Sequence, residues 1–331
     1  MATTARTVAI IPNFNGKHFL RPCIDALLSQ APSPPDIIVV DNGSSDGSSD
    51  FIKVNYPGVR LISMDRNAGF GAAVNRGIRD SAHEFIALVN NDATVRPGWL
   101  AALEKSLDGN PAAAAAPKVI FDDGRNIFDS AGDCVTPYGF VYKRGHFQPD
   151  TGQYDRPEEV FSVSAVATLF RRSLFNTIGL FDENFFAYYE DIDLCLRGRL
   201  AGFRFLYEPA AVTLHHYSAT SGSKVKLGTE EVYIHLTGIW IKNIPAPILI
   251  RRFPSIFIFH SAILAGVALA RLRKKSRLPR VPVVKFLASM ARQRREIQRR
   301  ASVSPRDLEK LMARENVFHA LCSRILKAVR K

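Results

Sequence analysis

Short apolar runs alternate with amphipathic stretches through the first hundred residues. The runs lie at residues 8–11, 37–40, 59–62 and 85–89. They are rich in β-branched residues and do not alternate with polar ones, which is typical of strands buried on both faces of a parallel sheet. The amphipathic stretches, such as 20–29 and 72–81, predict helices that cover this sheet. This order predicts an α/β fold with a mostly parallel, Rossmann-like central sheet flanked by helices.

The pattern is less regular after the fourth run. Residues 122–159 are polar and contain many glycines and tyrosines, so we expect hairpins and loops there, in an insertion that faces an acceptor. The other predicted elements are helices at 98–107 and 191–200, strands at 113–121, 162–170 and 212–214, and a short helix ending at Gly179.

From about residue 244 the chain becomes strongly apolar. Apolar runs at 248–250, 256–259 and 263–270 are bracketed by Arg251-Arg252 and by a basic run at 271–275. The uninterrupted apolar part is slightly short of the roughly 20 residues that a spanning helix needs. Lys and Arg flanking such a segment also describe a helix in the lipid headgroup region. We favour this interfacial attachment over one transmembrane span, and a buried core helix with a solvated basic tail is the third alternative.

The charge divides in the same way as the hydropathy. Residues 241–331 hold 22 Lys and Arg against 4 Asp and Glu, a net charge of +18, so the +13 of the whole chain leaves −5 for residues 1–240. The basic part is therefore predicted to meet an anionic membrane surface. Its second basic stretch, 292–300, lacks the interleaved aromatics that base stacking uses, so no nucleic-acid partner is expected.

The four cysteines, Cys23, Cys134, Cys195 and Cys322, are far apart and show neither metal-binding nor disulfide spacing. We interpret them as reduced. The N-terminus shows no charged region and apolar core ahead of a cleavage site, and a strand-like run begins at Thr7, so we expect no signal peptide. A cytoplasmic location is predicted, with peripheral attachment to the inner face of the cell membrane.

Polar residues follow the first two predicted strands, where ligands bind in such sheets. Phe14 can stack on a base, and Asn15 can bond to a ribose or to the backbone. Asp41 ends the second strand and can accept a hydrogen bond from a base or a ribose hydroxyl. Each segment alone also fits a structural turn or a helix cap. If the two strands are neighbours, however, Asp41 lies beside Phe14.

Glycines open the helix that follows the third strand. Gly69 and Gly71 leave N–H groups at its start that could hold an anion. A nicotinamide oxidoreductase is disfavoured, because Val74 stands in place of the third glycine and the segment follows the third strand instead of the first.

Two strand ends carry candidate metal ligands. Asn90-Asn91-Asp92 ends the fourth strand, and Mg²⁺ typically takes one or two carboxylates together with phosphate oxygens. His215 follows a late strand, and an imidazole beside Asp92 would shift the preference toward Mn²⁺. The alternatives are an Asn-rich turn and a structural histidine.

Three acids, Glu190, Asp191 and Asp193, lie in the first turn of a predicted helix, directly after four aromatic residues. The helix dipole favours acids there, so helix capping is one explanation. The aromatics could flank an acceptor or a sugar ring. Asp191 need not share a face with the other two acids, and a carboxylate near a metal diphosphate can take the proton of an attacking hydroxyl.

Together and in this order, these stretches resemble glycosyltransferase family 2, whose members are inverting enzymes with the GT-A fold. The likeness is greatest to its rhamnosyltransferase-like bacterial members and covers about residues 7–222. The resemblance implies a catalytic base at Asp191, metal ligands at Asp92 and His215, and acceptor binding by Tyr189 and Glu190. Nucleotide and donor binding are assigned to Pro12, Phe14, Asn15, Asp41, Asn67, Gly69 and Asn91.

The sequence departs from the family pattern in one place. Asn90 stands where the first acid of the family's Asp-X-Asp metal motif is expected, so Asp92 must provide most of the coordination. The Gln-X-X-Arg-Trp signature of processive synthases is absent, which favours transfer of a single sugar.

The change in charge and hydropathy, taken with the resemblance, predicts a division into two parts, and the resemblance implies an activity. Residues 1–240 would form the catalytic domain, with a nucleotide-binding half at about 1–121 and an acceptor-binding half at about 122–240, and residues 241–331 a basic, apolar helical extension. The expected reaction is Mg²⁺- or Mn²⁺-dependent transfer of one sugar, with rhamnose as a candidate. It runs from a nucleoside-diphosphate donor to a glycan or polyprenyl-linked glycan, in cell-surface polysaccharide synthesis. The alternative is a non-catalytic nucleotide-sugar or carbohydrate-binding module.

Overall fold

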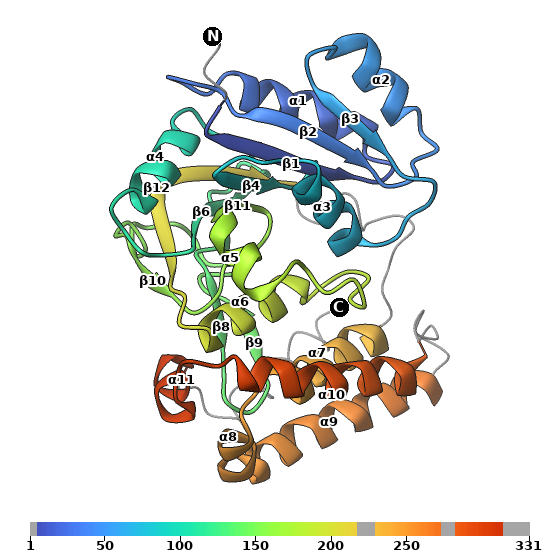
Figure 1. Cartoon of the computed structure of the whole chain (residues 1–331), viewed down its shortest axis with the longest axis vertical. Coiled ribbons are helices and arrows are strands. Elements are labelled where there is room, and N and C mark those ends of the chain that lie inside the picture. Colours follow the sequence, from blue (N-terminus) through green and yellow to red (C-terminus); the bar gives the residue numbers. More distant parts are fainter. Residues whose placement is uncertain (1–4, 217–228, 273–281, 314–331) are drawn as a thin grey trace. The chain divides into compact units, whose positions relative to one another are not determined.

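The computed structural model describes residues 5–216, 229–272 and 282–313. Within these residues the chain forms two compact units (Figure 1). The first comprises 5–133, 143–198 and 203–216, and the second comprises 134–142, 199–202, 229–272 and 282–313. Residues 217–222 at the end of the family resemblance, the basic residues at 273–275, and Cys322 lie outside the described part.

The first unit is built on a ten-stranded sheet with the order β10-β12-β6-β11-β4-β1-β2-β3, in which β5 also pairs with β12 and β7 with β6. The strands are β1 (Thr7–Asn13), β2 (Asp36–Asp41), β3 (Arg60–Ser63), β4 (Phe85–Val89), β5 (Ala93–Val95), β6 (Ala114–Phe121), β7 (Phe128–Ser130), β10 (Glu158–Val160), β11 (Ala167–Arg171) and β12 (Phe205–His215). Two further strands, β8 (Asp133–Val135) and β9 (Val141–Lys143), pair with each other.

Apolar side chains of the central strands are buried on both faces of the sheet. In β1, Val8 and Ile10 belong to one hydrophobic cluster, whereas Ala9 and Ile11 belong to the other. The first cluster includes side chains of α3 (Phe70–Arg79), α5 (Arg172–Ile178) and α6 (Glu190–Leu200). The second includes side chains of α1 (Lys17–Leu28), α2 (Ser48–Asn55) and α4 (Trp99–Leu107). The sheet is thus sandwiched between helices, which confirms the predicted α/β class.

Strand direction differs between the two halves of the sheet. β1 is parallel to β2 and β4, and β2 is parallel to β3. β11 lies antiparallel between β4 and β6, so this half is mixed. Apolar runs report burial and not direction, which is why the pattern did not reveal β11's orientation. The predicted strand at 162–170 begins only at Ala167, and the one at 212–214 extends over the whole of β12.

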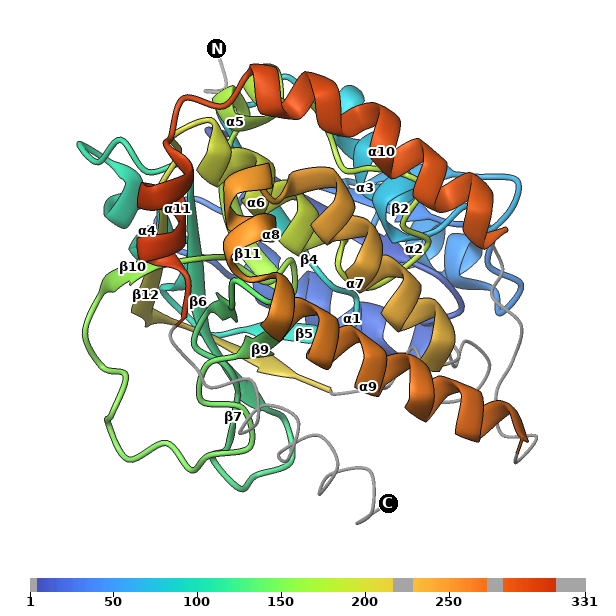
Figure 2. The same cartoon turned by 90° about the horizontal axis from the view of Figure 1, so that it is seen from below.

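The second unit is mainly helical, with α7 (Thr229–Asn243), α8 (Ala246–Arg251), α9 (Phe253–Leu272), α10 (Val283–Arg299) and α11 (Pro305–Leu311) (Figure 2). α10 packs on α7, where a Cβ at Gly238 would lie 2.4 Å from a ring carbon of Phe286. The predicted domain boundary at residue 240 falls inside α7. The division at this residue therefore stays a prediction. No helix within the described ranges combines the length and apolar character needed to cross a bilayer.

Candidate active site

The carboxyl ends of β1, β2 and β4 are tied together by amide side chains. The parallel register places Asn13 beside Asp41. Asn13 Nδ2 donates to Asp41 Oδ1 at 3.2 Å, and Asn91 Nδ2 donates to Asn13 Oδ1 at 2.8 Å. Two of the predicted nucleotide-binding residues, Asp41 and Asn91, are therefore joined through Asn13. Asn13 was not among the predicted site residues, although it lies between Pro12 and Phe14, which were.

Asp41 is buried, and its carboxylate already accepts several hydrogen bonds. The hydroxyls of Ser44 and Ser49 donate to its two oxygens, in addition to the bond from Asn13. A nucleotide that bonds to Asp41 would have to replace one of these donors. The nucleotide-binding role of Asp41 stays a prediction.

The turn after β1 is held against the loop after β2. Asn15 has a left-handed backbone with φ 51°, and its side-chain oxygen accepts from the N–H of Ser45 at 2.8 Å. Its own N–H donates to Ser44 Oγ at 2.8 Å. Pro12 and Phe14 beside it are half-buried. Phe14 and Asp41 therefore follow neighbouring strands, as expected from the sequence.

The loop before α3 meets the segment that leads into the acidic helix. Asn67 Oδ1 accepts from the N–H of Gly69 at 3.0 Å, and the N–H of Phe70 donates to the carbonyl of Phe186 at 2.9 Å. Gly69 has φ +97°, and a Cβ there would lie 2.6 Å from the oxygen of Phe186. Only glycine suits this position. The structure thus brings the predicted donor loop next to the aromatic segment of the predicted acceptor site.

Strand pairing brings the two predicted metal ligands together. β12 pairs with β5 so that His215 lies opposite Ala93, and the N–H of His216 donates to the carbonyl of Asp92 at 2.9 Å. His215 Nε2 is 3.4 Å from Asp92 Oδ1, and both residues are buried. Two ligands that each lie about 2.1 Å from one ion are about 3–3.5 Å apart. The pair therefore fits two coordination positions of a divalent ion.

A second carboxylate lies behind the histidine. Asp129 Oδ2 is 2.9 Å from His215 Nδ1, and Asp129 is fully buried. Asp129 belongs to β7 and His215 to β12, and both of these strands pair with β6. A carboxylate on the far nitrogen of a metal-binding histidine fixes the ring and its tautomer. Asp129 was not among the predicted site residues, because it lies within the irregular 122–159 segment and belongs to no motif.

Electrostatic effects in this cluster are strong. Burial disfavours ionisation of Asp129, yet the charge of Lys143 and the bonds with His146 and His215 hold its pKa well below the usual value. Burial also opposes protonation of His215, but the bonds with Asp129 and Asp92 outweigh it and raise its pKa to about 9. Metal binding would therefore release a proton from His215.

A divalent ion bound by Asp92 and His215 would need further ligands. Among the described residues no group of three or more His, Cys, Asp and Glu side chains has the spacing of a metal site. Mg²⁺ and similar ions commonly complete their coordination with phosphate oxygens and water. The structure therefore fits a two-ligand site that is filled together with a diphosphate.

The three acids of α6 have different surroundings. Asp193 is fully buried and pairs with Arg197 at 2.9 Å, so it has a structural role. Asp191 is half-buried, and its carboxylate accepts from the N–H of Ala165 at 3.3 Å and of Ile192 at 2.8 Å. Glu190 is buried, and within the described part of the chain its Oε2 has no hydrogen-bond partner. The sequence could not reveal these differences in burial and bonding.

A buried acid from outside the helix joins this group. Burial and the nearby charge of Asp191 raise the pKa of Asp133 to about 8, and the same two causes raise that of Glu190 to about 8. Burial also raises the pKa of Asp191, whereas the backbone N–H bonds and Lys143 favour its ionised form. Lys143 thus acts on both Asp129 and Asp191 and links the candidate metal pair to the candidate base.

The backbone directly before α6 is strained. Tyr188 and Tyr189 both have left-handed conformations, with φ 68° and 73°. Such conformations in bulky residues cost of order 1–3 kcal/mol each and cluster at functional sites. Tyr189, a predicted acceptor-binding residue, is therefore held immediately beside Glu190 in a conformation that its neighbours must enforce.

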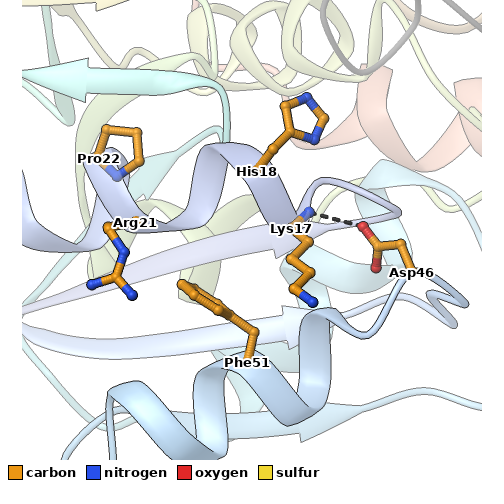
Figure 3. A pocket seen from close by; sticks show the side chains of 6 residues that line it. All are labelled: Lys17, His18, Arg21, Pro22, Asp46 and Phe51. Atoms are coloured by element: carbon orange, nitrogen blue, oxygen red, sulfur yellow. Dashed lines mark hydrogen bonds between the residues drawn. The ribbon is translucent and has the colours of Figure 1, made fainter.

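An open pocket of about 530 Å³ lies beside α1 and α2 (Figure 3). It is lined by Lys17, His18, Arg21, Pro22, Asp46 and Phe51. None of these is a predicted site residue, and Asp46 accepts from the N–H of Lys17 at 2.9 Å and caps α2 through Ser48. We assign this pocket no role in the chemistry.

Comparison with known proteins identifies the family and the fold. Residues 8–179 match the family described as Glycosyl transferase family 2. The chain is 30% identical over 217 residues to the N-acetylglucosaminyl-diphospho-decaprenol L-rhamnosyltransferase of Mycobacterium tuberculosis, an alignment that covers 57% of this chain and 69% of that protein.

Two solved structures are similar in fold. GalNAc-T7 with UDP, GalNAc and Mn²⁺ has a TM-score of 0.62 at 14% identity, over 90% of this chain and 55% of that chain. The mannosyltransferase PcManGT from Pyrobaculum calidifontis, in complex with GDP-Man and Mn²⁺, has a TM-score of 0.52 at 16% identity, over 98% of this chain and 88% of that chain. The GT-A fold predicted from the sequence is confirmed by these likenesses. The chain belongs to glycosyltransferase family 2, and glycosyl transfer is its class of reaction.

Proposed function

We propose that the chain transfers one sugar, with inversion, from a nucleoside-diphosphate donor to an acceptor hydroxyl. The observation that carries this proposal is a series of contacts from the buried side chains of Asp92, His215 and Asp129 to the half-buried Lys143, whose charge also acts on Asp191. It joins two candidate metal ligands to one candidate base within a single unit.

Asp191 is the proposed base. It takes the proton of the acceptor hydroxyl while the acceptor oxygen forms a bond to the anomeric carbon, and the sugar–phosphate bond breaks on the opposite side. The two backbone N–H groups and Lys143 favour its ionised form, and a raised pKa makes its carboxylate a stronger base. Glu190 and Asp133, whose pKa values are raised to about 8, are protonated at neutral pH and are less suited to this role.

Asp92 and His215 would hold a divalent ion, Mg²⁺ or Mn²⁺, which when bound neutralises the charge of the diphosphate leaving group. Asp129 keeps His215 oriented for this task. The strand-end residues from Pro12 to Asn15, together with Asp41, Asn91 and the Asn67–Gly69 loop, would hold the nucleotide and the donor sugar. Their shared edge of the sheet supports this assignment.

Glu190 and Tyr189 are the proposed acceptor-binding residues. Buried polar atoms are nearly always hydrogen-bonded in folded proteins. The buried Oε2 of Glu190 has no hydrogen-bond partner among the described residues, which supports a hydrogen bond with an acceptor hydroxyl.

Rhamnose is the proposed sugar, and a glycan on a polyprenyl diphosphate is the proposed acceptor. Both come from the name of the mycobacterial relative, an L-rhamnosyltransferase with a decaprenyl-linked substrate. Such an acceptor would be embedded in a membrane, as in the synthesis of cell-surface polysaccharides. We further propose that residues 241–331, with their net charge of +18, attach the enzyme to the inner, anionic face of the cell membrane.

A thermal-unfolding screen of sugar nucleotides, each with and without Mn²⁺, tests the proposal. A donor present at 100 times its Kd stabilises the fold by about 2.7 kcal/mol, and we expect this stabilisation to require the ion. The hit is then incubated with acceptor glycans to detect transfer and the anomeric configuration. Stabilisation without transfer by any acceptor would favour the binding-module alternative. Metal-independent stabilisation would refute the role of Asp92 and His215.

A further inference from the structure

Helix α9 has apolar side chains on two opposite sides. One side is packed within its own unit, where Phe259 is fully buried. The ring of Phe259 lies 5.6 Å from that of Tyr138 and 5.9 Å from that of Phe140, measured between centroids. Protein therefore covers this side of the helix.

The other side of α9 is exposed and equally apolar. Phe253 is 62% exposed and Phe257 is 60% exposed, and their rings stack at 5.9 Å. Ile258 is 39% exposed, and Ile250 of the preceding α8 is 75% exposed. At about 100° per residue, Phe257, Phe253 and Ile258 lie about 160°, 120° and 100° around the helix axis from Phe259, so all three face away from it. Figure 2 shows α8 leading into α9. We name Ile250, Phe253, Phe257 and Ile258 the α8–α9 apolar surface.

Positive charge borders this surface. Arg251 and Arg252 lie between its first two members and both pair with Glu309, at 2.5 and 2.6 Å, so one carboxylate balances two cations. Residues 253–270 contain no Asp, Glu, Lys or Arg, and the sequence then continues with Arg271, Arg273, Lys274 and Lys275. Phenylalanine and isoleucine beside arginine are the side chains that occupy the boundary between acyl chains and anionic headgroups.

We propose that the α8–α9 apolar surface inserts into the headgroup region of an anionic bilayer, with α9 lying in the membrane plane. Because protein covers the Phe259 side, lipid meets only the exposed side of this helix. This inference deepens the proposed function, since it places the enzyme on the membrane that would carry a lipid-linked acceptor. Docking itself does not depend on which sugar is transferred.

Co-sedimentation of the full chain with vesicles tests the proposal. Vesicles of phosphatidylcholine with phosphatidylglycerol are compared with vesicles of phosphatidylcholine alone, in the absence of sugar nucleotide. The wild type should bind the anionic vesicles, and more weakly at high salt. The double variant Phe253→Ser/Phe257→Ser should lower the partition coefficient about 10-fold for each ring removed, because each loses most of its insertion free energy.

Val54→Ser is the matched control. Val54 is an apolar side chain of α2 that is 79% exposed, so its replacement removes a similar exposed group outside the surface. Its vesicle binding should equal that of the wild type. Circular dichroism melts of both variants verify that substitutions at these exposed positions leave the fold intact.

Three outcomes would overturn the proposal: vesicle binding by the double variant equal to the wild type, equal binding to vesicles without anionic lipid, or no vesicle binding at all. Light scattering identifies the competing case, in which the wild type dimerises and the double variant does not. Transfer to a water-soluble acceptor is measured in parallel. Retained transfer with lost vesicle binding separates failure of docking from failure of the proposed function.

Discussion

Replacing Asp129 by asparagine is expected to weaken Mn²⁺ binding about 10- to 100-fold. Asparagine has nearly the same size, so the substitution leaves no cavity beside β7. It removes the negative charge that faces His215 Nδ1 at 2.9 Å and Lys143 Nζ at 2.8 and 3.0 Å. The substitution therefore changes the charge beside His215 and the force that orients its ring, and it leaves the packing unchanged.

The magnitude follows from the bond that is weakened. A hydrogen bond to a charged group contributes about 1.5–3 kcal/mol, against about 1 kcal/mol for a neutral one. The variant keeps an acceptor but loses the charge, so His215 Nε2 becomes a weaker ligand and its ring is less firmly held. A loss of about 1.4–2.7 kcal/mol corresponds to the 10- to 100-fold range.

Titration calorimetry with Mn²⁺, with and without a sugar nucleotide, measures the effect. Asp133→Asn provides the matched control, because Asp133 is also a buried acid near Lys143 but bonds to Ser130 and not to His215. Circular dichroism at the titration temperature verifies that each variant is folded. Wild-type affinity in Asp129→Asn, or an equal loss in Asp133→Asn, would refute the argument that Asp129 supports the metal ligand.

Three further predictions concern the base, the buried acids and the core. Asp191→Asn should lower turnover about 10²- to 10⁴-fold while donor affinity, measured by calorimetry, stays unchanged; near-normal turnover would exclude it as the base. Burial raises the pKa of Asp133 and Glu190 to about 8, above their values of about 4 in an unfolded chain, so the fold holds protons that the unfolded chain releases. The free energy of unfolding should therefore decline as the pH rises from about 4 through about 8. In thermal melts Asp133→Asn should make this decline less steep. A wild type whose stability does not decline over this range would contradict the raised pKa values of the two acids. Gly77→Ala should lower the free energy of unfolding, measured in urea, by about 1–3 kcal/mol, because the added Cβ would lie 2.6 Å from Cγ2 of Ile10. An unchanged unfolding midpoint would show that Ile10 and β1 can move to make room for the methyl group.

The pattern of apolar residues located the parallel half of the sheet well. The runs at 8–11, 37–40 and 85–89 lie within β1, β2 and β4, because strands buried on both faces must be apolar throughout. The same pattern missed the start and direction of β11, since burial is equal for parallel and antiparallel neighbours. Boundaries and pairing depend on hydrogen bonds with distant strands, which a local pattern does not contain.

The sequence by itself determined which residue types stand at the strand ends, and therefore the family and the candidates for donor, metal and base. Only the tertiary structure decided which of these candidates lie close together and how each is buried and bonded. Asp92 and His215 are far apart in the chain, and they meet because β5 pairs with β12. Asp129 and Lys143 belong to no sequence motif. They enter the candidate site because β7 places the charge of Asp129 beside His215 and β9 places the charge of Lys143 near Asp129 and Asp191. A charge acts through distance and burial, and folding sets both.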